Sequence, residues 1–541
     1  MEGQDHTPML YSLKVCFSLS GLAIIFFEES SSEGAKMLLG DIVRQNAMKF
    51  PNKTALIYGD TRLTYLELNN QANRLANALL DIGMTKGDRV AVLADNCPEY
   101  VVTYFACAKS GLIIVPVNTT LDNEGIAYII NGSEANTVIF GENYADLISS
   151  MQSRLSTVRH YIVIGQAPDC ASYQEITAKH TSDEPEVALS DDDIAWLCYT
   201  SGTTGVPKGV MLSHKNIISN VTGMIISGYP IGRNEINLCL VPLTHATGML
   251  HPLIYYIVGA TNVLLERYDP KLVLELIQRE KVTATIITSP LLASIIDYPG
   301  VRNYDVSSLR LALSGGAPIP EGSVRKFNRI FGDIIMAGYG MTEASSFIMI
   351  IPLLEGPLSK VRRGGSCGRE LVNVEARVVN EEGEDAAPGE VGELLAAGDN
   401  VMKGYWHMPE ETAKTLEGGY LHTSDLAMKD KEGYYYITGR KKDMIITAGQ
   451  GVLSPEIENV ISLHAAVSEV AVIGAPDKEL GEIVQAFVAL KKGENTTEQE
   501  IIEWCSSQLE DYKVPKLVKF VDSLPKTASG KVQKTALEKQ G

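Results

Sequence analysis

The amino-acid sequence predicts an α/β protein with a large N-terminal domain, in which parallel-rich sheets lie between helices, followed by a small α+β domain. Two observations support this fold class. Helical and strand-like patterns alternate from about residue 60 to 300, and after about residue 365 short strands separated by turns replace them. A chain of 541 residues is also far longer than one typical hydrophobic core, so two or more folding units are expected.

The first half of the chain carries the alternation. Apolar residues recur at helical spacing in some stretches, and short continuous apolar runs between them indicate buried strands. Strands that alternate with helices are typical of βαβ units, which align the strands in parallel and place helices on both faces of the sheet. The predicted elements are the helices Tyr65–Ile82, Glu99–Ala108 and Asp269–Glu280, and the strands Arg89–Leu93, Ile113–Val117 and Ala284–Thr288.

The last hundred residues have enough elements for a domain of their own. A charged turn, Thr438–Asp443, lies between two apolar strands and marks the boundary that we expect, giving domains at 37–438 and 439–541. The predicted elements after residue 365 are the strands Glu375–Val379, Tyr434–Ile437, Glu469–Ile473 and Gln485–Leu490, and the helices Ser454–Leu463 and Thr497–Leu509.

Composition excludes some classes of protein. Apolar residues make up 45% and charged residues 21%, as in ordinary globular proteins. The net charge of −19 argues against broad nucleic-acid binding, which needs a concentrated basic surface, although a few local Lys and Arg can still bind phosphates. The eight cysteines are scattered, without CxxC or zinc spacing, which indicates a reducing compartment and a cytoplasmic protein.

Residues 1–36 read as an extension, or as an overlong start with Met37 as the true one. The run Val15–Phe27 is uncharged and mostly apolar, but its 13 residues fall short of the roughly 20 that a membrane span needs. The acidic beginning is not that of a signal peptide. A membrane anchor is the alternative that this run leaves open.

The segment Thr200–Gly209 has the chemistry of a phosphate-binding loop. Its glycines let the backbone approach a ligand, its hydroxyls and exposed N–H groups can donate to phosphate oxygens, and Lys208 adds a charge. It is not a Walker A loop, because Pro207 precedes the lysine and Gly209 follows it. The alternative for such a segment taken alone is a flexible surface turn.

The string Ser-Gly-Thr-Thr-Gly-x-Pro-Lys-Gly resembles the signature loop of the adenylate-forming superfamily, which includes acyl-CoA synthetases, luciferases and peptide-synthetase adenylation domains. Other segments resemble the same family in the same order, from about residue 38 to the end. They are Pro242–Gly248, Ser314–Ala317, Gly338–Glu343, Tyr420–Asp425, Gly439–Arg440 and Pro525–Lys531. The resemblance implies a distorted barrel within the large domain, and a C-terminal domain that is mobile.

The resemblance also implies roles for individual residues. Joining a carboxylate to the α-phosphate of ATP brings two anions together, so charge neutralisation and positioning should dominate catalysis. Lys531 is expected to bridge the acyl carboxylate and the α-phosphate, and Glu343 to bind Mg²⁺ with the Thr200 hydroxyl as second contact. The β- and γ-phosphates should lie on Ser201, Gly202, Thr203, Thr204, Gly205 and Lys208, adenine near Gly315, Gly316, Ala317, Tyr339, Gly340, Met341 and Thr342, and the ribose on Asp425 and Arg440.

His245 should gate the acid pocket, although a lone histidine beside an apolar run is more often a packed core residue. The pocket should be lined partly by Met249–Tyr256 and Ser289–Ala293, both largely apolar, which favours fatty or aryl acids. For thioester formation, the resemblance places a hinge at Lys442 and brings Ala448 and Gly449 to the pantetheine arm of coenzyme A.

Three functions remain open at this stage. An acid–CoA ligase is favoured by the hinge and thiol-loop residues, and the alternatives are an enzyme that loads a carrier protein and a non-catalytic nucleotide-binding relative. The sequence Gly364–Gly368 satisfies G-x-S-x-G, but a charged segment precedes it where a hydrolase needs a buried strand. The acid stays open between fatty and aryl acids, and the oligomeric state stays open between a monomer and a homodimer.

Overall fold

The computed structural model describes residues 36–200, 207–315, 321–526 and 532–538, together with the backbone of β1 (Cys16–Phe17) and β2 (Ala23–Ile24). By backbone contacts the chain divides into Met1–Met37 and Leu38–Gly541. In the first unit β1 and β2 pair antiparallel, with Cys16 opposite Ile24. Among the described residues, no helix combines the length and the apolar character needed to cross a membrane.

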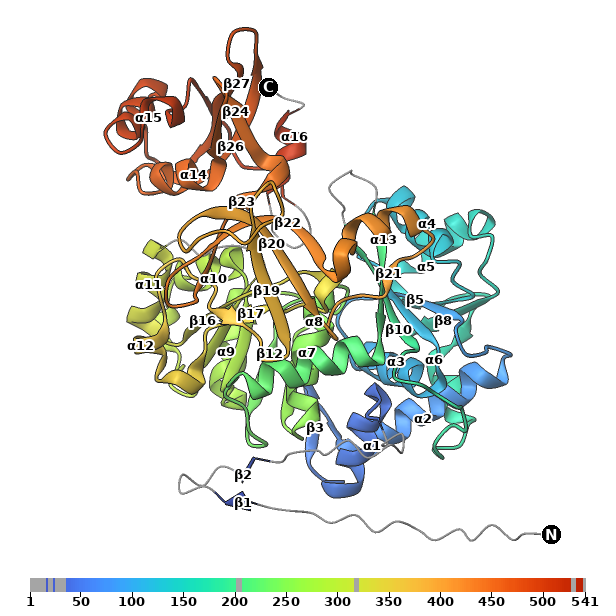
Figure 1. Ribbon diagram of the computed structural model, residues 1–541. Coiled ribbons are helices and arrows are strands. Elements are labelled where there is room, and N and C mark those ends of the chain that lie inside the picture. The colour runs from blue at the N-terminus through green and yellow to red at the C-terminus, as the bar shows by residue number, and fades with distance from the viewer. Residues whose placement is uncertain are drawn as a thin grey trace, which may run out of the picture. The chain divides into compact units, whose positions relative to one another are not determined.

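Two large mixed sheets, both rich in parallel pairs, organise the second unit (Figure 1). Among the described residues, one sheet has eight strands in the order β21 (Gly404–Tyr405), β11 (Lys208–Ser213), β10 (Ile194–Thr200), β6 (Ile113–Pro116), β5 (Arg89–Leu93), β7 (Thr137–Gly141), β8 (His160–Ile164) and β9 (Ala171–Ser172). The other, within the same described ranges, has nine in the order β18 (Arg369–Glu370), β17 (Met349–Ile350), β16 (Ile335–Tyr339), β15 (Leu311–Ser314), β14 (Ala284–Ile287), β12 (Ile236–Cys239), β13 (Thr261–Leu264), β3 (Thr54–Tyr58) and β4 (Thr61–Thr64).

Helices cover both faces of each large sheet. In β5, Val90 and Val92 join a central core, whereas Ala91 and Leu93 join a second core on the opposite face. This alternation follows from the period of two along a strand. The helices that pack in the central core are α1 (Leu39–Lys49), α2 (Tyr65–Asp81), α3 (Pro98–Ser110), α6 (Tyr173–Ala178), α7 (His214–Ile226) and α8 (Ala246–Ile257). The outer face of the eight-stranded sheet is covered by α4 (Asn123–Gly132) and α5 (Ala145–Met151). The outer face of the nine-stranded sheet is covered by α9 (Pro270–Glu280), α10 (Ser289–Ile296) and α11 (Glu321–Phe331).

A third sheet follows in the sequence. In the described part of the chain it has four antiparallel strands, β19 (Val374–Val379), β20 (Val391–Gly398), β22 (Leu421–Lys429) and β23 (Tyr435–Arg440), and the short helices α12 (Leu358–Val361) and α13 (Pro409–Thr415) lie near it in the sequence. An isolated bridge between Gly368 and Tyr435 connects this sheet to the chain next to β18. This antiparallel sheet lies almost wholly within residues 37–438, the large domain in which the distorted barrel is expected.

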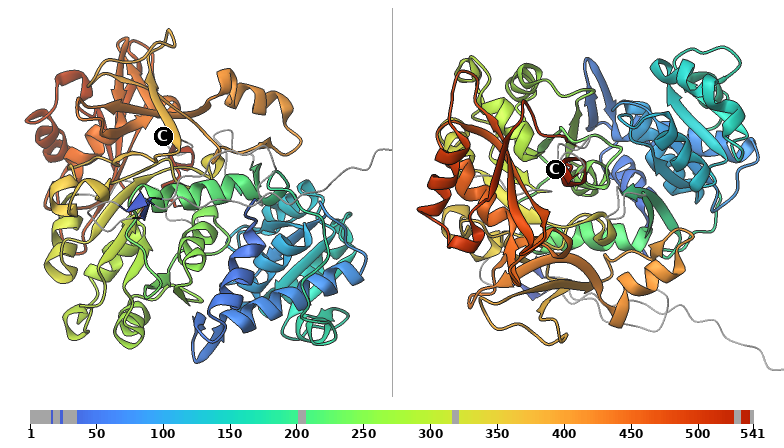
Figure 2. Two further views of the ribbon diagram at one scale, coloured as in Figure 1. Left: turned by 60° about the horizontal axis from the view of Figure 1, so that its bottom comes forward. Right: turned by 90° about the horizontal axis from the view of Figure 1, so that it is seen from above.

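The residues after Lys441 form a five-stranded sheet with two hydrophobic clusters of their own. Figure 2 shows this part, in orange to red, from two further sides. Within the described residues its strands are β24 (Met444–Thr447), β25 (Gln450–Leu453), β26 (Val467–Asp477), β27 (Gly481–Leu490) and β28 (Leu517–Phe520), and its helices are α14 (Ser454–Ser462), α15 (Glu498–Ser506) and α16 (Lys534–Glu538).

The predicted helices and strands are confirmed, with differences at their ends. The helix predicted from Tyr65 is α2, which begins there because Thr64 and Glu67 form a capping box. Thr497, predicted as the first helical residue, is instead the N-cap of α15 and accepts a hydrogen bond from the Glu500 N–H. The strand predicted at Tyr434–Ile437 continues to Arg440 as β23, which matters for the site described below.

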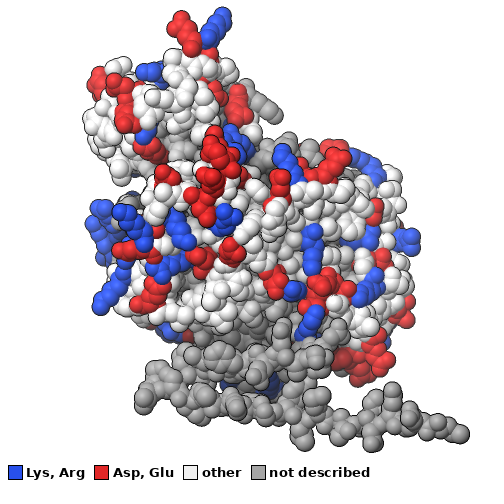
Figure 3. Space-filling view, in the orientation of Figure 1, with Lys and Arg blue, Asp and Glu red and all other residues white. Residues whose placement is uncertain are grey.

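The surface carries charges of both signs. On the face shown in Figure 3, acidic and basic side chains are interspersed. Among the described residues, Arg154 pairs with Glu124 and Lys281 with Asp305, and all four side chains are exposed. Such exposed pairs add little stability, about 0–1 kcal/mol each.

Candidate active site

The ends of the glycine-rich segment lie side by side. Strands β10 and β11 pair antiparallel, with Thr200 opposite Lys208. A Cβ added to Gly209 would lie 3.0 Å from the Leu197 side chain and 3.1 Å from the Tyr199 ring, so close packing favours glycine there. The structure therefore brings Thr200 and Lys208 together, while the predicted phosphate ligands Ser201, Gly202, Thr203, Thr204 and Gly205 lie outside the described residues.

Lys208 is a buried cation with two neighbours from a distant part of the sequence. Only 8% of the residue is exposed. Its ammonium group pairs with the Glu411 carboxylate and lies 5.1 Å from the centroid of the Tyr405 ring. Tyr405 is in place because β21 pairs with β11, setting Tyr405 opposite Val210. This sheet edge thus surrounds Lys208 with a carboxylate and an aromatic face, both of which stabilise a buried positive charge.

Glu343 contacts the hydroxyl group of Tyr405, the residue whose ring lies beside Lys208. The Tyr405 hydroxyl donates a hydrogen bond to Glu343 Oε1 at 3.0 Å, and Glu343 is 7% exposed. Burial raises the pKa of the Glu343 carboxyl, while the bond from Tyr405 and the positive charges of Lys208 and Arg440 oppose that rise. The structure therefore joins two predicted site residues, Lys208 and Glu343, through one tyrosine.

The loop that carries Glu343 is tightly held. A Cβ on Gly340 would lie 1.7 Å from the Ser346 carbonyl oxygen, so only glycine fits. Asn220 Nδ2 donates to the carbonyl oxygens of Ala344 and Phe347 at 3.1 and 2.6 Å. Met341 and Thr342 lie in the same loop, which Asn220 fixes to α7.

Asp425 is the centre of a second polar group. Arg440 Nε donates to Asp425 Oδ1 at 2.9 Å, and the Tyr339 hydroxyl donates to Oδ2 at 2.5 Å. The two charged residues face each other because Asp425 of β22 is paired with Arg440 of β23. Burial and the neighbouring Asp425 raise the pKa of Tyr339, so the phenol stays protonated and donates. Since an ionised carboxylate has about four acceptor sites, Asp425 can accept further donors as well.

His245 stands at the start of α8, at its N-cap, and is half-buried. The turn that contains it is tight, because a Cβ on Gly248 would lie 2.0 Å from the Pro242 carbonyl oxygen. One residue before Gly248, the Thr247 hydroxyl hydrogen-bonds the Ser346 hydroxyl at 2.9 Å, which links this segment to the Glu343 loop.

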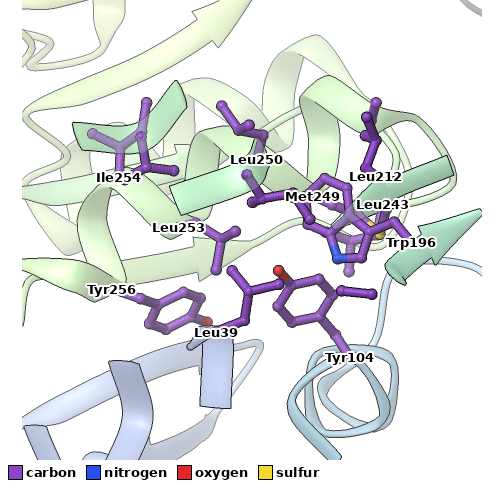
Figure 4. Close-up of a cluster of buried hydrophobic side chains, with 14 of the residues drawn as sticks. Leu39, Tyr104, Trp196, Leu212, Leu243, Met249, Leu250, Leu253, Ile254 and Tyr256 are labelled. Atoms are coloured by element: carbon purple, nitrogen blue, oxygen red, sulfur yellow. The ribbon is translucent and has the colours of Figure 1, made fainter. Parts of the chain in front are cut away.

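Helix α8 also lines a small apolar cavity. Figure 4 shows five of the residues around it, Tyr104, Leu243, Met249, Leu253 and Tyr256, within a cluster of buried hydrophobic side chains. Leu243 and four residues of the expected segment Met249–Tyr256 form one wall, and α3 forms the other. The second segment expected at the acid pocket, Ser289–Ala293, begins α10, and its Leu292 packs in the outer core of the nine-stranded sheet. The complete lining is Tyr100, Val101, Tyr104, Phe105, Leu243, Met249, Pro252, Leu253 and Tyr256.

The predicted hinge and thiol-loop residues lie after the third sheet. Lys442 is exposed in a short 3-10 turn, Lys441–Asp443, directly after β23. Ala448 and Gly449 form the turn of the β24–β25 hairpin, with φ of +50° and +77°. A Cβ on Gly449 would meet nothing within 4 Å. Gly315 directly follows β15, whereas Gly316, Ala317 and Lys531 lie outside the described residues.

Comparison with known proteins decides the family. Residues 43–406 match the family described as AMP-binding enzyme, and residues 456–531 match its C-terminal domain. The chain belongs to the AMP-binding enzyme family. It is 35% identical to a feruloyl-CoA synthase of Amycolatopsis sp over 498 residues, which cover 92% of this chain and 97% of that one. It is 33% identical to a long-chain-fatty-acid–CoA ligase of Bacillus subtilis, over 92% and 94% of the two chains.

A solved structure of the family has the same fold. The anthranilate CoA ligase AuaEII in complex with anthranoyl-AMP superimposes with a TM-score of 0.86 at 29% identity, covering 93% of this chain and 97% of that one. The predicted family and fold class are therefore confirmed. The adenylate-forming enzymes of this family use ATP, and the relatives named here include CoA ligases.

Sequence reasoning missed Tyr405 and Glu411. Both lie about 200 residues from Lys208, in a two-residue strand and a short helix that have too few residues for a periodic pattern. The segment Gly404-Tyr-Trp-His407 offers an aromatic signal, but nothing in it indicates which strand it pairs with. Only the sheet order places Tyr405 between the two predicted site residues.

The site offers one carboxylate donor, Glu343, that suits a magnesium ion. In the described ranges, no group of three or more His, Cys, Asp or Glu could hold a metal. Magnesium typically takes only one or two protein carboxylates and completes its shell with water and phosphate oxygens. Glu343, a buried carboxylate whose Oε1 is fixed by Tyr405, is a donor of that kind.

Proposed function

We propose that this enzyme is an acid–CoA ligase. It forms an acyl-AMP from a carboxylic acid and ATP, then transfers the acyl group to coenzyme A with release of AMP and pyrophosphate. The observation that carries the proposal is the set of buried charged groups Lys208, Glu343 and Asp425, in a chain 35% identical to a feruloyl-CoA synthase. Burying a charged group carries a large desolvation penalty unless the charge is paired or binds a ligand, so clusters of buried charges are typical of functional sites.

The residues divide the work of the first step between them. Lys208 neutralises the β- and γ-phosphates together with the segment 201–205, and Lys531 bridges the carboxylate and the α-phosphate. Asp425 accepts the ribose hydroxyls, with Arg440 beside it, and Tyr339 and the segments around Gly315 and Gly340 hold adenine. Such fixed charges stabilise a transition state without reorganising when it forms.

Magnesium, held by Glu343 with Thr200, would screen the charge of the leaving pyrophosphate. The chain's own contribution is to keep Glu343 ionised and oriented. Tyr405 does this through its hydrogen bond to Oε1, and Lys208 does it through its charge, both against the effect of burial.

The second step uses the part of the chain after the proposed hinge at Lys442. The predicted division at 438/439 falls within β23, so we propose that the small domain begins after this strand, where the separate hydrophobic clusters of the last hundred residues start at Ile445. Rotation about Lys442 would exchange Lys531 for the turn Ala448–Gly449, and open space around Gly449 would admit a thiol arm.

The acid is proposed to be fatty or aryl. Helix α8, which begins directly after His245, lines a cavity with apolar side chains, which suits an apolar acid better than a small polar one. The names of the relatives, feruloyl-CoA synthase and long-chain-fatty-acid–CoA ligase, fall on both sides of this choice. The cytoplasmic location stays a prediction from the sequence, and the homodimer and a membrane anchor at residues 15–27 stay the alternatives that the sequence leaves open.

The test is AMP and pyrophosphate release by the purified protein with ATP, Mg²⁺ and CoA, across acids of graded length and aromaticity. Release should depend on acid and should be accelerated by CoA, with the acyl-CoA identified by mass spectrometry. Acid-dependent AMP without any effect of CoA would favour a carrier protein as acceptor. No acid-dependent AMP with any member of the series would contradict the proposal.

A further inference from the structure

Glu411 is a carboxylate at the place where phosphate is expected. It lies in the first turn of α13 and pairs with the Lys208 ammonium. The side chain of Lys208 is 9% exposed, whereas that of Glu411 is 38% exposed. Its hydrogen bond to Lys208 lowers the pKa of Glu411, so the carboxylate is charged at neutral pH.

A carboxylate and a triphosphate cannot share this lysine without strong repulsion. Charges of like sign a few ångströms apart near a protein surface repel, and a triphosphate carries several negative charges. One ammonium group offers three donors, but it neutralises a single charge. If the phosphates reach Lys208, Glu411 therefore has to leave it.

The two partners differ in their freedom to move. Lys208 belongs to a strand that is paired on both sides, with β10 and with β21, so its backbone is fixed. Glu411 belongs to a helix of seven residues, and its side chain borders solvent. Its neighbour Thr412 accepts a hydrogen bond from the Tyr405 N–H at 2.9 Å, so α13 stays attached to β21. Glu411 can thus swing away while its helix remains in place.

We propose that Glu411 is an internal competitor of the nucleotide, which holds Lys208 until the triphosphate displaces it and pairs with Lys208 again as pyrophosphate leaves. This inference rests on the proposed function, because that function assigns Lys208 to the β- and γ-phosphates. It adds a residue that tunes ATP affinity and pyrophosphate release, and it gives α13 a role in the site.

The test compares the dissociation constants of ATP, pyrophosphate and AMP by isothermal titration calorimetry for the wild type, Glu411→Gln and Glu410→Gln. Glu410 is the matched control, since it is the exposed neighbouring carboxylate on the same helix. Removing a competing ion pair of a half-exposed group should tighten ATP and pyrophosphate about fivefold. AMP, which lacks the β- and γ-phosphates, should bind unchanged, and Glu410→Gln should match the wild type for all three ligands.

A second variant of Glu411 and a double-mutant cycle with Lys208 test whether the effect comes from the ion pair. Glu411→Asp should tighten pyrophosphate by less than Glu411→Gln, and in a Lys208→Gln background Glu411→Gln should change nothing. Unchanged or weaker ATP and pyrophosphate binding in Glu411→Gln would overturn the inference and assign the pair a structural role, as would equal tightening of AMP. A wild-type protein that binds neither ATP nor pyrophosphate would instead refute the proposed function.

Discussion

Replacing Tyr405 by Phe removes one hydroxyl from the centre of the candidate site and leaves the ring in place. The variant keeps the aromatic face beside Lys208 but breaks the hydrogen bond to Glu343 Oε1, which is 3.0 Å long. Glu343 then remains buried with one fewer donor. The perturbation therefore tests whether the tyrosine that connects Lys208 to Glu343 positions the proposed magnesium ligand.

The size of the effect follows from the bond that is lost. A hydrogen bond to a charged group contributes about 1.5–3 kcal/mol, and each 1.4 kcal/mol corresponds to a factor of ten. We expect kcat/KM for ATP to fall by about 10- to 100-fold in Tyr405→Phe. The half-saturating Mg²⁺ concentration should rise with it.

The pH profile supplies a second readout. Burial already raises the pKa of Glu343, and Tyr405 partly offsets that rise by stabilising the ionised form. Without the hydroxyl the pKa rises further, so the carboxylate becomes protonated at a higher pH. The acid limb of the kcat/KM profile should therefore move to higher pH in Tyr405→Phe. A purely structural role would not move this limb.

Tyr65→Phe is the matched control. Tyr65 is fully buried, and its hydroxyl donates to the Ala260 carbonyl oxygen at 2.5 Å rather than to a predicted site residue. It should lose about 0.5–1.5 kcal/mol of unfolding free energy and keep the wild-type Mg²⁺ dependence. If Tyr405→Phe behaves like Tyr65→Phe in kcat/KM, Mg²⁺ dependence and pH profile, the positioning role is wrong.

Three further substitutions test other parts of the account. Lys442→Pro should spare adenylate formation but abolish thioester formation, measured as separate half-reactions, and equal loss of both would contradict the hinge. Lys531→Ala should suppress acyl-AMP formation while still converting supplied acyl-AMP to acyl-CoA, and uniform loss would count against its assigned role. Gly340→Ala places a Cβ 1.7 Å from the Ser346 carbonyl oxygen and should lower the unfolding free energy in urea by roughly 2–4 kcal/mol. Gly322→Ala, with open space around it, should stay within about 1 kcal/mol of the wild type, and an equal loss in both would refute the steric argument.

The sequence predicts the βα alternation well because the signal is local. Thr64 caps α2, Asp269 caps α9 with Pro270 after it, and the hydrophobic periods of these helices lie within single windows. The order of strands within the sheets cannot be predicted in this way, because it depends on long-range pairing. It brings β21 beside β11 across almost 200 residues, and no local pattern contains that pairing.

The residues of the candidate site likewise fall into two groups, those found from local motifs and those found only from long-range contacts. Glu343, Asp425 and Arg440 are found from motifs, and the structure adds that Asp425 and Arg440 are cross-strand partners. Tyr405 and Glu411 have no motif of their own and become visible only through the contacts of Lys208 and Glu343. Site residues that are far apart in the sequence and lack a motif can therefore be found only from the three-dimensional structure.

The central claim is that the acid is activated by attack on the α-phosphate of ATP, and oxygen isotopes test it most directly. An acid labelled with ¹⁸O in its carboxylate supplies the bridging oxygen of the acyl-AMP. When the thiol attacks the carbonyl carbon, that oxygen leaves with the phosphate. Incubation with ATP, Mg²⁺ and CoA should therefore give AMP that carries one ¹⁸O, together with unlabelled pyrophosphate. Label in orthophosphate with formation of ADP, or AMP without label, would contradict the account.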